Sequence, residues 1–276
     1  MSAIDLFEEA CALCLEGKPA QAVETLRAGI MDGLWWSPSL LDGDPDLAGL
    51  RGQIEYPDMR RICESRFRSE QAAARPRLLV ISPATTPWEP KTLFVIHWWG
   101  DTASSFVGPW RRLVDEGWTL VVPQSSQMCC SGSYCWDDTA RALAELRQHL
   151  EDCARKRGLG LEGMVLAGAS QGAPLALELA HEVGAPWLCV VPSFPSGYDV
   201  SPLLGVPRRA RGAFLLGEQD PANARARPVM EALRGAGIPW FQTILEGVGH
   251  ELPDELAVRV AEILRELRSA TEGEDA

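Results

Sequence analysis

The sequence predicts an α/β protein, with a mostly parallel sheet covered by helices and a small all-α segment in front of it. From residue 76 onward, short apolar runs alternate with amphipathic stretches, the pattern of parallel strands joined by helices. The runs TLFVIHW, TLVVP, MVLAG and AFLLG are apolar almost throughout, as strands covered on both faces should be. Residues 1–72 lack strand patterning. We therefore expect a helical N-terminal segment over 1–72 and an α/β domain over 73–276.

Within the N-terminal segment, two helices are expected near 3–16 and 19–32, with Pro19 at a first-turn position. The spacing of their alanines and leucines resembles part of one tetratricopeptide unit. A single unit of this kind cannot bury its own apolar face, so we expect the segment to pack against another element. A third helix is expected near 57–73.

In the α/β domain, the apolar runs and the amphipathic stretches place the strands and helices in turn. The expected strands lie near 77–83, 92–98, 118–123, 163–168, 186–192, 212–217 and 239–245. The expected helices lie near 105–115, 138–157, 171–183, 223–236 and 254–269. The first two strands are joined by a short loop that contains proline, so we expect them to form an antiparallel pair.

The composition indicates a folded protein without a polyanionic partner. The chain has 276 residues, of which 46% are hydrophobic and 23% charged, and its net charge is -12. Since nucleic-acid binding relies on Lys and Arg that neutralise phosphates, we expect no nucleic-acid partner. The N-terminus carries acidic residues, and no window of 18 uninterrupted apolar residues occurs, so we expect neither a signal peptide nor a membrane span. The eight cysteines then fit reduced thiols in a cytoplasmic protein.

The stretch VLAGASQGAPLAL places a G-x-S-x-G motif where an expected strand meets an expected helix. Active residues of open α/β sheets lie at the carboxyl ends of the strands. A nucleophile on such a tight turn needs small neighbours, and Gly168 and Gly172 meet that need. A helix starting at Gln171 would also direct free backbone N–H groups at developing negative charge. The motif therefore predicts Ser170 as a nucleophile.

A serine hydroxyl needs a base that takes its proton. The chain has four histidines. His149 and His181 fall inside expected helices and are interpreted as surface residues. His250 follows the last expected strand in the Gly-rich loop EGVGH, which is where an α/β fold with a Ser, acid, His order places its base. We therefore expect His250 to be the base.

The base needs an acid that orients it, and the acid should lie between the serine and the histidine in the chain. Asp220 follows the strand near 212–217 in the stretch GEQDP and is the expected acid. Glu218 is the alternative, because it lies two residues nearer the strand. The oxyanion of acyl transfer needs amide donors. We expect one to be the amide of Gln171 and the other to come from the loop around 94–101.

These motifs resemble those of the phospholipase/carboxylesterase family of α/β-hydrolases, which includes acyl-protein thioesterases. The similarity covers about 76–276 and rests on GASQG, HWWGD, PQSSQ, GEQD and GVGH. The resemblance implies the α/β-hydrolase fold and a triad of Ser170, His250 and Asp220. It further implies hydrolysis of small carboxylic esters or thioesters through an acyl-enzyme, with no metal and no organic cofactor. The N-terminal segment lies outside the similarity.

The HWWGD loop departs from the family pattern. Trp98 stands where the family has the glycine that follows the histidine. By position, the second oxyanion amide is assigned to Trp99, with Trp98 as the alternative. Trp98 and Trp136 are expected to line the substrate pocket, because such pockets are mostly apolar, and ordinary core packing is the alternative for each.

Two other functions remain open at this point. A triad on this fold could cleave peptides or amides, with the N-terminal helices filtering substrates. Alternatively, the helical segment could recruit a partner while the hydrolase domain serves as a non-catalytic scaffold. The acyl group, the oligomeric state and the redox state of Cys129, Cys130 and Cys135 do not follow from residue spacing.

Overall fold

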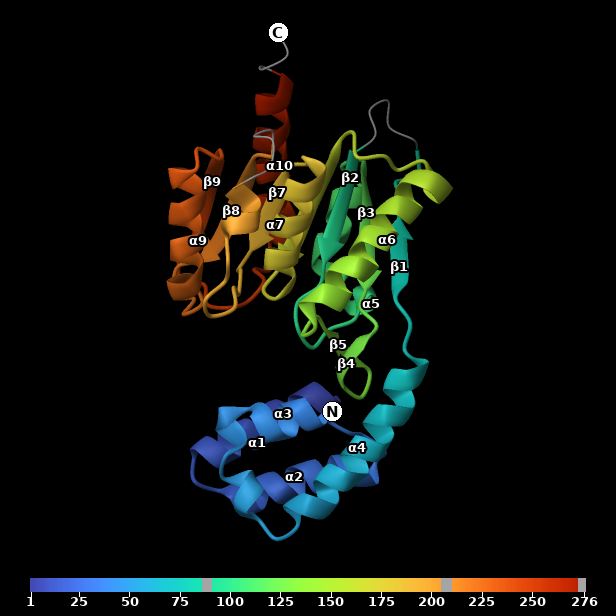
Figure 1. Ribbon diagram of the computed structural model, residues 1–276, viewed down its shortest axis with the longest axis vertical. Coiled ribbons are helices and arrows are strands. Elements are labelled where there is room, and N and C mark those ends of the chain that lie inside the picture. The colour runs from blue at the N-terminus through green and yellow to red at the C-terminus, as the bar shows by residue number, and fades with distance from the viewer. Residues whose placement is uncertain (86–90, 205–209, 273–276) are drawn as a thin grey trace. The chain divides into compact units, whose positions relative to one another are not determined.

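The computed structural model in Figure 1 describes residues 1–85, 91–204 and 210–272, with side chains described as far as residue 269. The chain divides into two compact units. One unit comprises Met1–Pro76 and Ser125–Cys135, and the other comprises Arg77–Gln124 and Trp136–Ala276. Each unit is described separately below.

The larger unit contains a seven-stranded sheet in the order β1-β3-β2-β6-β7-β8-β9. All neighbours pair in parallel except β1 and β3, which are antiparallel. The mostly parallel sheet expected from the sequence is thus confirmed. Its strands are β1 (Arg77–Ile81), β2 (Lys91–Ile96), β3 (Trp118–Gln124), β6 (Met164–Ala169), β7 (Trp187–Val190), β8 (Gly212–Gly217) and β9 (Trp240–Leu245).

Helices cover both faces of this sheet (Figure 1), so its five inner strands are buried on both sides, whereas the edge strands β1 and β9 are partly exposed. Phe94 and Ile96 of β2 belong to one core, which contains residues of α6, α7 and α9. Leu93 and Val95 belong to the other core, which contains residues of α5, η3 and α10. The helices are α5 (Ala103–Phe106), the 3-10 helix η3 (Gly108–Val114), α6 (Thr139–Arg157), α7 (Gly172–Val183), α8 (Ser201–Leu204), α9 (Asn223–Gly235) and α10 (Leu256–Glu272).

The first strand does not pair with the second, so that prediction is wrong. The strand β1 pairs antiparallel with β3 at the edge of the sheet, and β2 lies between β3 and β6. The burial of the two strands explains this order. Residues 93–96 of β2 are fully buried, which suits a strand inside the sheet with a neighbouring strand on each side. The strand β1 is only partly buried, which suits a position at the edge of the sheet.

Two histidines interpreted as surface residues are in fact buried. His149 of α6 is 8% exposed and His181 of α7 is 3% exposed. The ring of His181 lies 6.2 Å from that of Trp187, and its Nδ1 lies 2.8 Å from the Leu177 carbonyl oxygen one turn earlier. Burial lowers the pKa of both imidazoles, which favours the neutral form. Periodicity placed both residues in helices but did not show how much of each helix is covered.

The expected helix near 105–115 is replaced by α5 and η3, with Pro109 in the first turn of η3. Proline lacks the N–H that a continuous α-helix would need at this point. The other expected helices of the α/β domain lie within about two or three residues of their predicted ends. Within the described residues, no helix is long and apolar enough to cross a membrane.

The smaller unit is built from helices and one β-hairpin. The first helix begins with a capping box, in which Ser2 and Asp5 each accept a hydrogen bond from the other's backbone N–H. Pro19 occupies the first turn of the second helix, as expected. The elements are α1 (Ala3–Leu15), α2 (Pro19–Met31), α3 (Pro38–Gly43), η1 (Pro45–Leu47), η2 (Leu50–Gly52), α4 (Tyr56–Ala73), β4 (Gln127–Cys130) and β5 (Ser133–Cys135).

The hairpin is attached to the helices of this unit by backbone hydrogen bonds. The Ser37 amide donates to the Cys129 carbonyl at 2.8 Å, and the Ser131 amide donates to the Trp35 carbonyl at 3.0 Å. The side chain of Gln71 bonds the backbone of residues 126 and 128 at 2.7 and 2.9 Å. The two units are therefore interleaved in the sequence, and the division into 1–72 and 73–276 stays a prediction.

Candidate active site

Ser170 lies on the sharp turn between β6 and α7. Its φ of 47° falls in the left-handed region, which a non-glycine residue adopts only when the surroundings hold it there. The Ser170 amide donates to the Val190 carbonyl at 3.0 Å, and the Ser170 carbonyl accepts from the Ser193 amide at 3.1 Å. The end of β7 and the residues that follow it thus bind both the N–H and the carbonyl group of Ser170.

The two glycines of the motif are required by close backbone approach. A Cβ on Gly168 would lie 2.1 Å from the Gly172 carbonyl oxygen, and a Cβ on Gly172 would lie 2.5 Å from the Ile96 carbonyl oxygen. Any side chain would therefore push the start of α7 away from the strand ends. The G-x-S-x-G pattern follows from how tightly the helix packs on β6 and β2.

The structure brings Ser170, His250 and Asp220 together in one chain of hydrogen bonds. His250 Nε2 lies 2.8 Å from Ser170 Oγ, and His250 Nδ1 lies 2.8 Å from Asp220 Oδ2. The carboxylate accepts the Nδ1 proton, so Nε2 is left as an acceptor for the serine hydroxyl. Asp220 is only 3% exposed, and its other oxygen accepts from the Ala222 amide at 2.8 Å. Asp220 is therefore fixed in place by the turn that carries it.

The loop of His250 packs directly on the end of β8. A Cβ on Gly217 would lie 2.3 Å from the Gly249 carbonyl oxygen, so only glycine permits this approach. The Gln219 amide donates to the Val248 carbonyl at 2.9 Å. These contacts join the GEQD and GVGH stretches and hold Asp220 close to His250.

Glu218, the alternative acid, points elsewhere. Its Oε2 accepts from the Gly247 amide at 3.0 Å and so holds the start of the loop that carries His250. Asp220 is the carboxylate that contacts the imidazole. The turn after β8 decides between Asp220 and Glu218. It brings Asp220, the third residue after the strand, next to His250, and directs Glu218, the first residue, away from it.

Gln171 follows Ser170 and is the N-cap of α7, without a side-chain capping bond. Its Oε1 accepts from the Trp136 amide at 2.8 Å, and its Nε2 donates to Asp137 Oδ1 at 2.8 Å. Because the side chain is engaged in this way, the first N–H groups of the helix are left without a side-chain acceptor. The helix dipole adds partial positive charge at the same place.

The loop after β2 accommodates Trp98 without strain. Among the described residues, only Ser170 and Val191 combine a side chain with a positive φ, whereas the positive φ in this loop falls on Gly100, at 83°. The indole of Trp98 donates to Asp101 Oδ2 at 2.9 Å. Both Trp98 and Trp99 are half-buried. A side chain at position 98 is thus accommodated, because the turn bends two residues later, at Gly100.

Trp136 connects this loop to Gln171 at the start of α7 by two hydrogen bonds. Its ring is 2% exposed and lies 4.7 Å from the ring of His97. Its indole N–H donates to the His97 carbonyl at 2.9 Å, while its backbone N–H binds Gln171. Sequence reasoning missed this role, because residue 136 lies far from both partners in the chain. That Trp136 lines a substrate pocket stays a prediction, as it does for Trp98.

His97 is fully buried behind the same loop. Burial lowers its pKa to about 4, and its Nδ1 lies 2.7 Å from the Trp98 carbonyl oxygen. The imidazole is therefore neutral at pH 7 and acts as a hydrogen-bonded part of the core. Among the described residues, no group of three or more His, Cys, Asp or Glu side chains is arranged to hold a metal ion.

No protein-family model and no curated protein sequence matches the chain, but solved structures do. A protein of Bacillus cereus described as uncharacterized is 20% identical with a TM-score of 0.58, over 94% of this chain and 85% of its own. A carboxylesterase of Bacillus cereus is 16% identical with a TM-score of 0.53, over 72% of this chain and 98% of its own. A carboxylesterase of Mesorhizobium loti is 19% identical with a TM-score of 0.52, over 63% of this chain and 88% of its own.

The coverages distinguish two kinds of neighbour. Residues 1–76 make up more than a quarter of the 276-residue chain, so a match over 94% of it includes most of the N-terminal helices. The matches to the carboxylesterases cover 72% and 63% of the chain, a share close to that of the larger unit. The parallel sheet and its covering helices are those of these esterases, and the chain has the α/β-hydrolase fold that the sequence predicts.

Proposed function

We propose that the protein is a serine hydrolase that cleaves carboxylic ester or thioester bonds of small molecules through an acyl-enzyme. The observation that carries this proposal is the hydrogen-bond chain from Asp220 through His250 to Ser170 Oγ. The serine lies on a strained turn at the carboxyl ends of the strands, where α/β enzymes hold their reactive groups. The carboxylesterases with the same fold support the same reaction class.

In the first half of the proposed cycle, Ser170 Oγ attacks the substrate carbonyl carbon while His250 Nε2 takes the hydroxyl proton. Asp220 holds the Nδ1 proton and stabilises the imidazolium that forms. The C–O or C–S bond of the tetrahedral intermediate then breaks, and His250 delivers its proton to the departing alkoxide or thiolate. The acyl group remains on Ser170 as an ester.

In the second half, a water molecule replaces the leaving group. His250 Nε2 takes a proton from this water, and the resulting hydroxide attacks the acyl ester. The bond from the acyl carbon to Ser170 Oγ breaks, the serine oxygen recovers its proton from His250, and the carboxylic acid leaves. The three side chains account for every proton transfer in this cycle.

The oxyanion of both intermediates would be bound by the amides of Gln171 and Trp99, with Trp98 as the alternative to Trp99. Removing one such donor costs about 3 to 4 kcal/mol of transition-state stabilisation in a serine protease. Trp136 supports both donors, because its amide holds the Gln171 side chain and its indole holds the His97 carbonyl. We therefore assign Trp136 as a positioning residue for the oxyanion site.

Labelling with a fluorophosphonate probe tests the nucleophile. The wild-type chain should be labelled at Ser170, and Ser170→Ala should not be labelled. Ser193→Ala is the matched control. Ser193 lies next to Ser170, because its backbone amide bonds the Ser170 carbonyl, but its side-chain hydroxyl takes no part in the proton relay. Labelling of Ser170→Ala at the wild-type rate would contradict the mechanism.

A substrate panel tests the bond that is cleaved. Aryl esters and acyl thioesters of graded chain length should be hydrolysed, with Ser170→Ala as the blank, and peptide amides should be poor substrates. Clear preference for peptide amides would favour the peptidase or amidase alternative. Absence of all hydrolysis, together with an unlabelled Ser170, would favour a binding scaffold.

A further inference from the structure

A cavity of about 340 Å³ is formed by the segment that follows β7 and the first half of α9. The strand β7 lies between β6, which Ser170 follows, and β8, which Asp220 follows. Since these strands are parallel, the segments that leave their carboxyl ends lie at one edge of the sheet. This cavity, the α9 cavity, therefore lies at the same edge as the three proposed catalytic residues.

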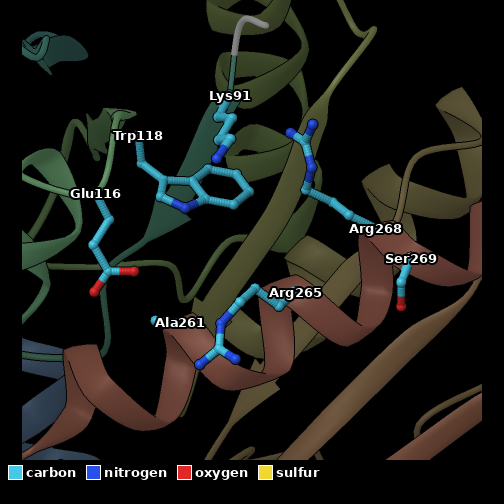
Figure 2. A pocket seen from close by; sticks show the side chains of 7 residues that line it. All are labelled: Lys91, Glu116, Trp118, Ala261, Arg265, Arg268 and Ser269. Carbon is cyan, nitrogen blue, oxygen red and sulfur yellow. The ribbon is translucent and has the colours of Figure 1, made fainter. Parts of the chain in front are cut away.

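A second cavity, shown in Figure 2, lies at the opposite edge of the sheet. Its residues Lys91 and Trp118 begin β2 and β3, and a strand rises about 3.3 Å per residue, so this cavity lies more than about 15 Å from the carboxyl ends. Figure 2 also shows Lys91 and Arg268 across the Trp118 ring from the Arg265 guanidinium, so these cations do not surround a single point. A group attached to a small ester at Ser170 would not reach this second cavity.

The walls of the α9 cavity are mostly apolar and are held in place. The Tyr198 ring lies 5.0 Å from the ring of Phe194, which is buried, and the Tyr198 hydroxyl donates to Glu178 Oε1 at 2.9 Å. The apolar lining residues are Pro195, Tyr198, Val200, Ala224, Pro228 and Val229. The φ angles of the two prolines are fixed by their rings. Such walls suit hydrocarbon groups, as in most small-molecule sites.

Arg225 is the one charged side chain among the described residues that line the α9 cavity. Its Nη2 donates to the uncharged Ser193 Oγ at 3.2 Å, and it forms no ion pair with any described residue. Asp199, the acidic residue of the segment after β7, accepts instead from the Ser201 amide at 2.9 Å. A guanidinium has five N–H donors, so Arg225 can bind an anion without giving up its bond to Ser193.

The Arg225 guanidinium is joined to the Ser170 backbone through a single residue. Ser193 accepts from Arg225 with its hydroxyl and donates to the Ser170 carbonyl with its amide at 3.1 Å. Two hydrogen bonds and one serine keep the guanidinium within about 10 Å of the Ser170 carbonyl oxygen. An extended acyl chain of about four to six carbons with a terminal carboxylate spans such a distance.

We propose that the ester or thioester substrate carries a carboxylate group, which Arg225 binds while the apolar walls of the α9 cavity contact the intervening carbons. This inference rests on the proposed hydrolase function and names its substrate class. Arginine fits a carboxylate through two parallel N–H bonds. One cation matches the single negative charge of a carboxylate, whereas a phosphate monoester carries about -1.5 to -2 at pH 7. Half-esters of short dicarboxylic acids carry this charge on the acyl part, and esters of hydroxy acids carry it on the alcohol part.

Hydrolysis of two matched pairs of esters tests the proposal, with Ser170→Ala as the blank. The first pair, 4-nitrophenyl monoadipate and 4-nitrophenyl hexanoate, differs by a carboxylate on the acyl part. The second pair, 4-hexanoyloxybenzoate and phenyl hexanoate, differs by a carboxylate on the alcohol part. In at least one pair, the wild type should have a kcat/KM at least tenfold higher for the charged ester, and that pair identifies the part that carries the carboxylate.

Arg225→Gln should remove this preference, because it keeps a polar side chain but removes the charge. The kcat/KM for the charged ester should fall at least tenfold, mainly through KM, while kcat/KM for the neutral ester should change less than twofold. Retained hydrolysis of the neutral ester also shows that the variant is folded. Arg227→Gln is the matched control, since Arg227 lies on the same helix but lines another cavity, and it should leave both values unchanged.

Two results would overturn the inference while the hydrolase function stands. One is hydrolysis of the neutral esters by the wild type with no preference for a charged ester. The other is an equal loss of both activities in Arg225→Gln, or a loss in Arg227→Gln as large as that in Arg225→Gln. If the wild type hydrolyses none of the four esters, the proposed hydrolase function itself fails, and the inference fails with it.

Discussion

The substitution Asp220→Asn tests the proton relay most directly, because it changes charge and hydrogen bonding with almost no change in shape. In the wild type, both carboxylate oxygens accept: one from the Ala222 amide at 2.8 Å and the other from His250 Nδ1 at 2.8 Å. Asparagine has one acceptor oxygen and one NH2 donor. If the oxygen keeps the bond to the Ala222 amide, the NH2 group faces the imidazole.

The consequence is the wrong tautomer of His250. An NH2 group opposite Nδ1 makes Nδ1 the acceptor, so the proton moves to Nε2, which then faces the Ser170 hydroxyl at 2.8 Å. A protonated Nε2 cannot accept the serine proton. The corresponding change in a serine protease lowers kcat about 10⁴-fold, which corresponds to roughly 5.5 kcal/mol of activation free energy. We expect a loss of the same order here.

The measurement is kcat on a short-chain aryl ester, together with the rate of fluorophosphonate labelling. Glu218→Gln is the matched control, because Glu218 is also a carboxylate after β8 but bonds the Gly247 amide. The control should retain kcat within about tenfold. The reasoning is refuted if Asp220→Asn keeps kcat within tenfold of the wild type, or if the control loses as much.

Three further predictions concern the support of the site. Gly172→Ala places a Cβ 2.5 Å from the Ile96 carbonyl oxygen and should lower the free energy of unfolding by more than about 1 kcal/mol in urea titrations, whereas Gly160→Ala, with open space around its Cβ, should change it little. Trp136→Phe keeps an aromatic ring but removes the indole N–H and with it the bond to the His97 carbonyl; the loss of roughly 1 to 2 kcal/mol should lower kcat about tenfold with KM nearly unchanged. Because the pKa of His97 falls from 6.5 to about 4 on folding, the unfolded chain binds the proton more readily, and stability is lost as pH falls below 6.5. Between pH 7 and 5 the loss from this group should be about 2 kcal/mol, and His97→Gln should lack it in unfolding titrations at the two pH values.

The strands of the fold could be predicted because each is an apolar run bounded by turn residues. The order of the strands could not, since it depends on competition for neighbours. The run of β1 is as apolar as that of β2, yet only β2 is buried on both faces. The hairpin of β4 and β5 was missed for a similar reason: its pairing partners include Trp36, which is remote in sequence.

The candidate site was predictable where chemistry restricts residue type within a short stretch. Ser170, Asp220 and His250 each follow a strand in a turn whose sequence permits a tight bend. The supports of the site depend instead on contacts between distant segments. Nothing in the sequence around Trp136 shows that its indole bonds His97 or that its amide bonds Gln171, because these contacts follow from how the chain returns to the sheet.

The backbone strain at Ser170 is accompanied by strain at the end of the neighbouring strand. Val191 follows β7 with a φ of 36°, which is unfavourable for a β-branched residue and costs about 1 to 3 kcal/mol. Its side chain is fully buried, and burial of a valine side chain contributes about 1.5 to 3 kcal/mol. Glycine would relax the backbone but lose that burial, so valine is tolerated here. Since the Ser170 amide donates to the Val190 carbonyl at 3.0 Å, the apolar core beneath β7 helps to hold Ser170 in its strained conformation.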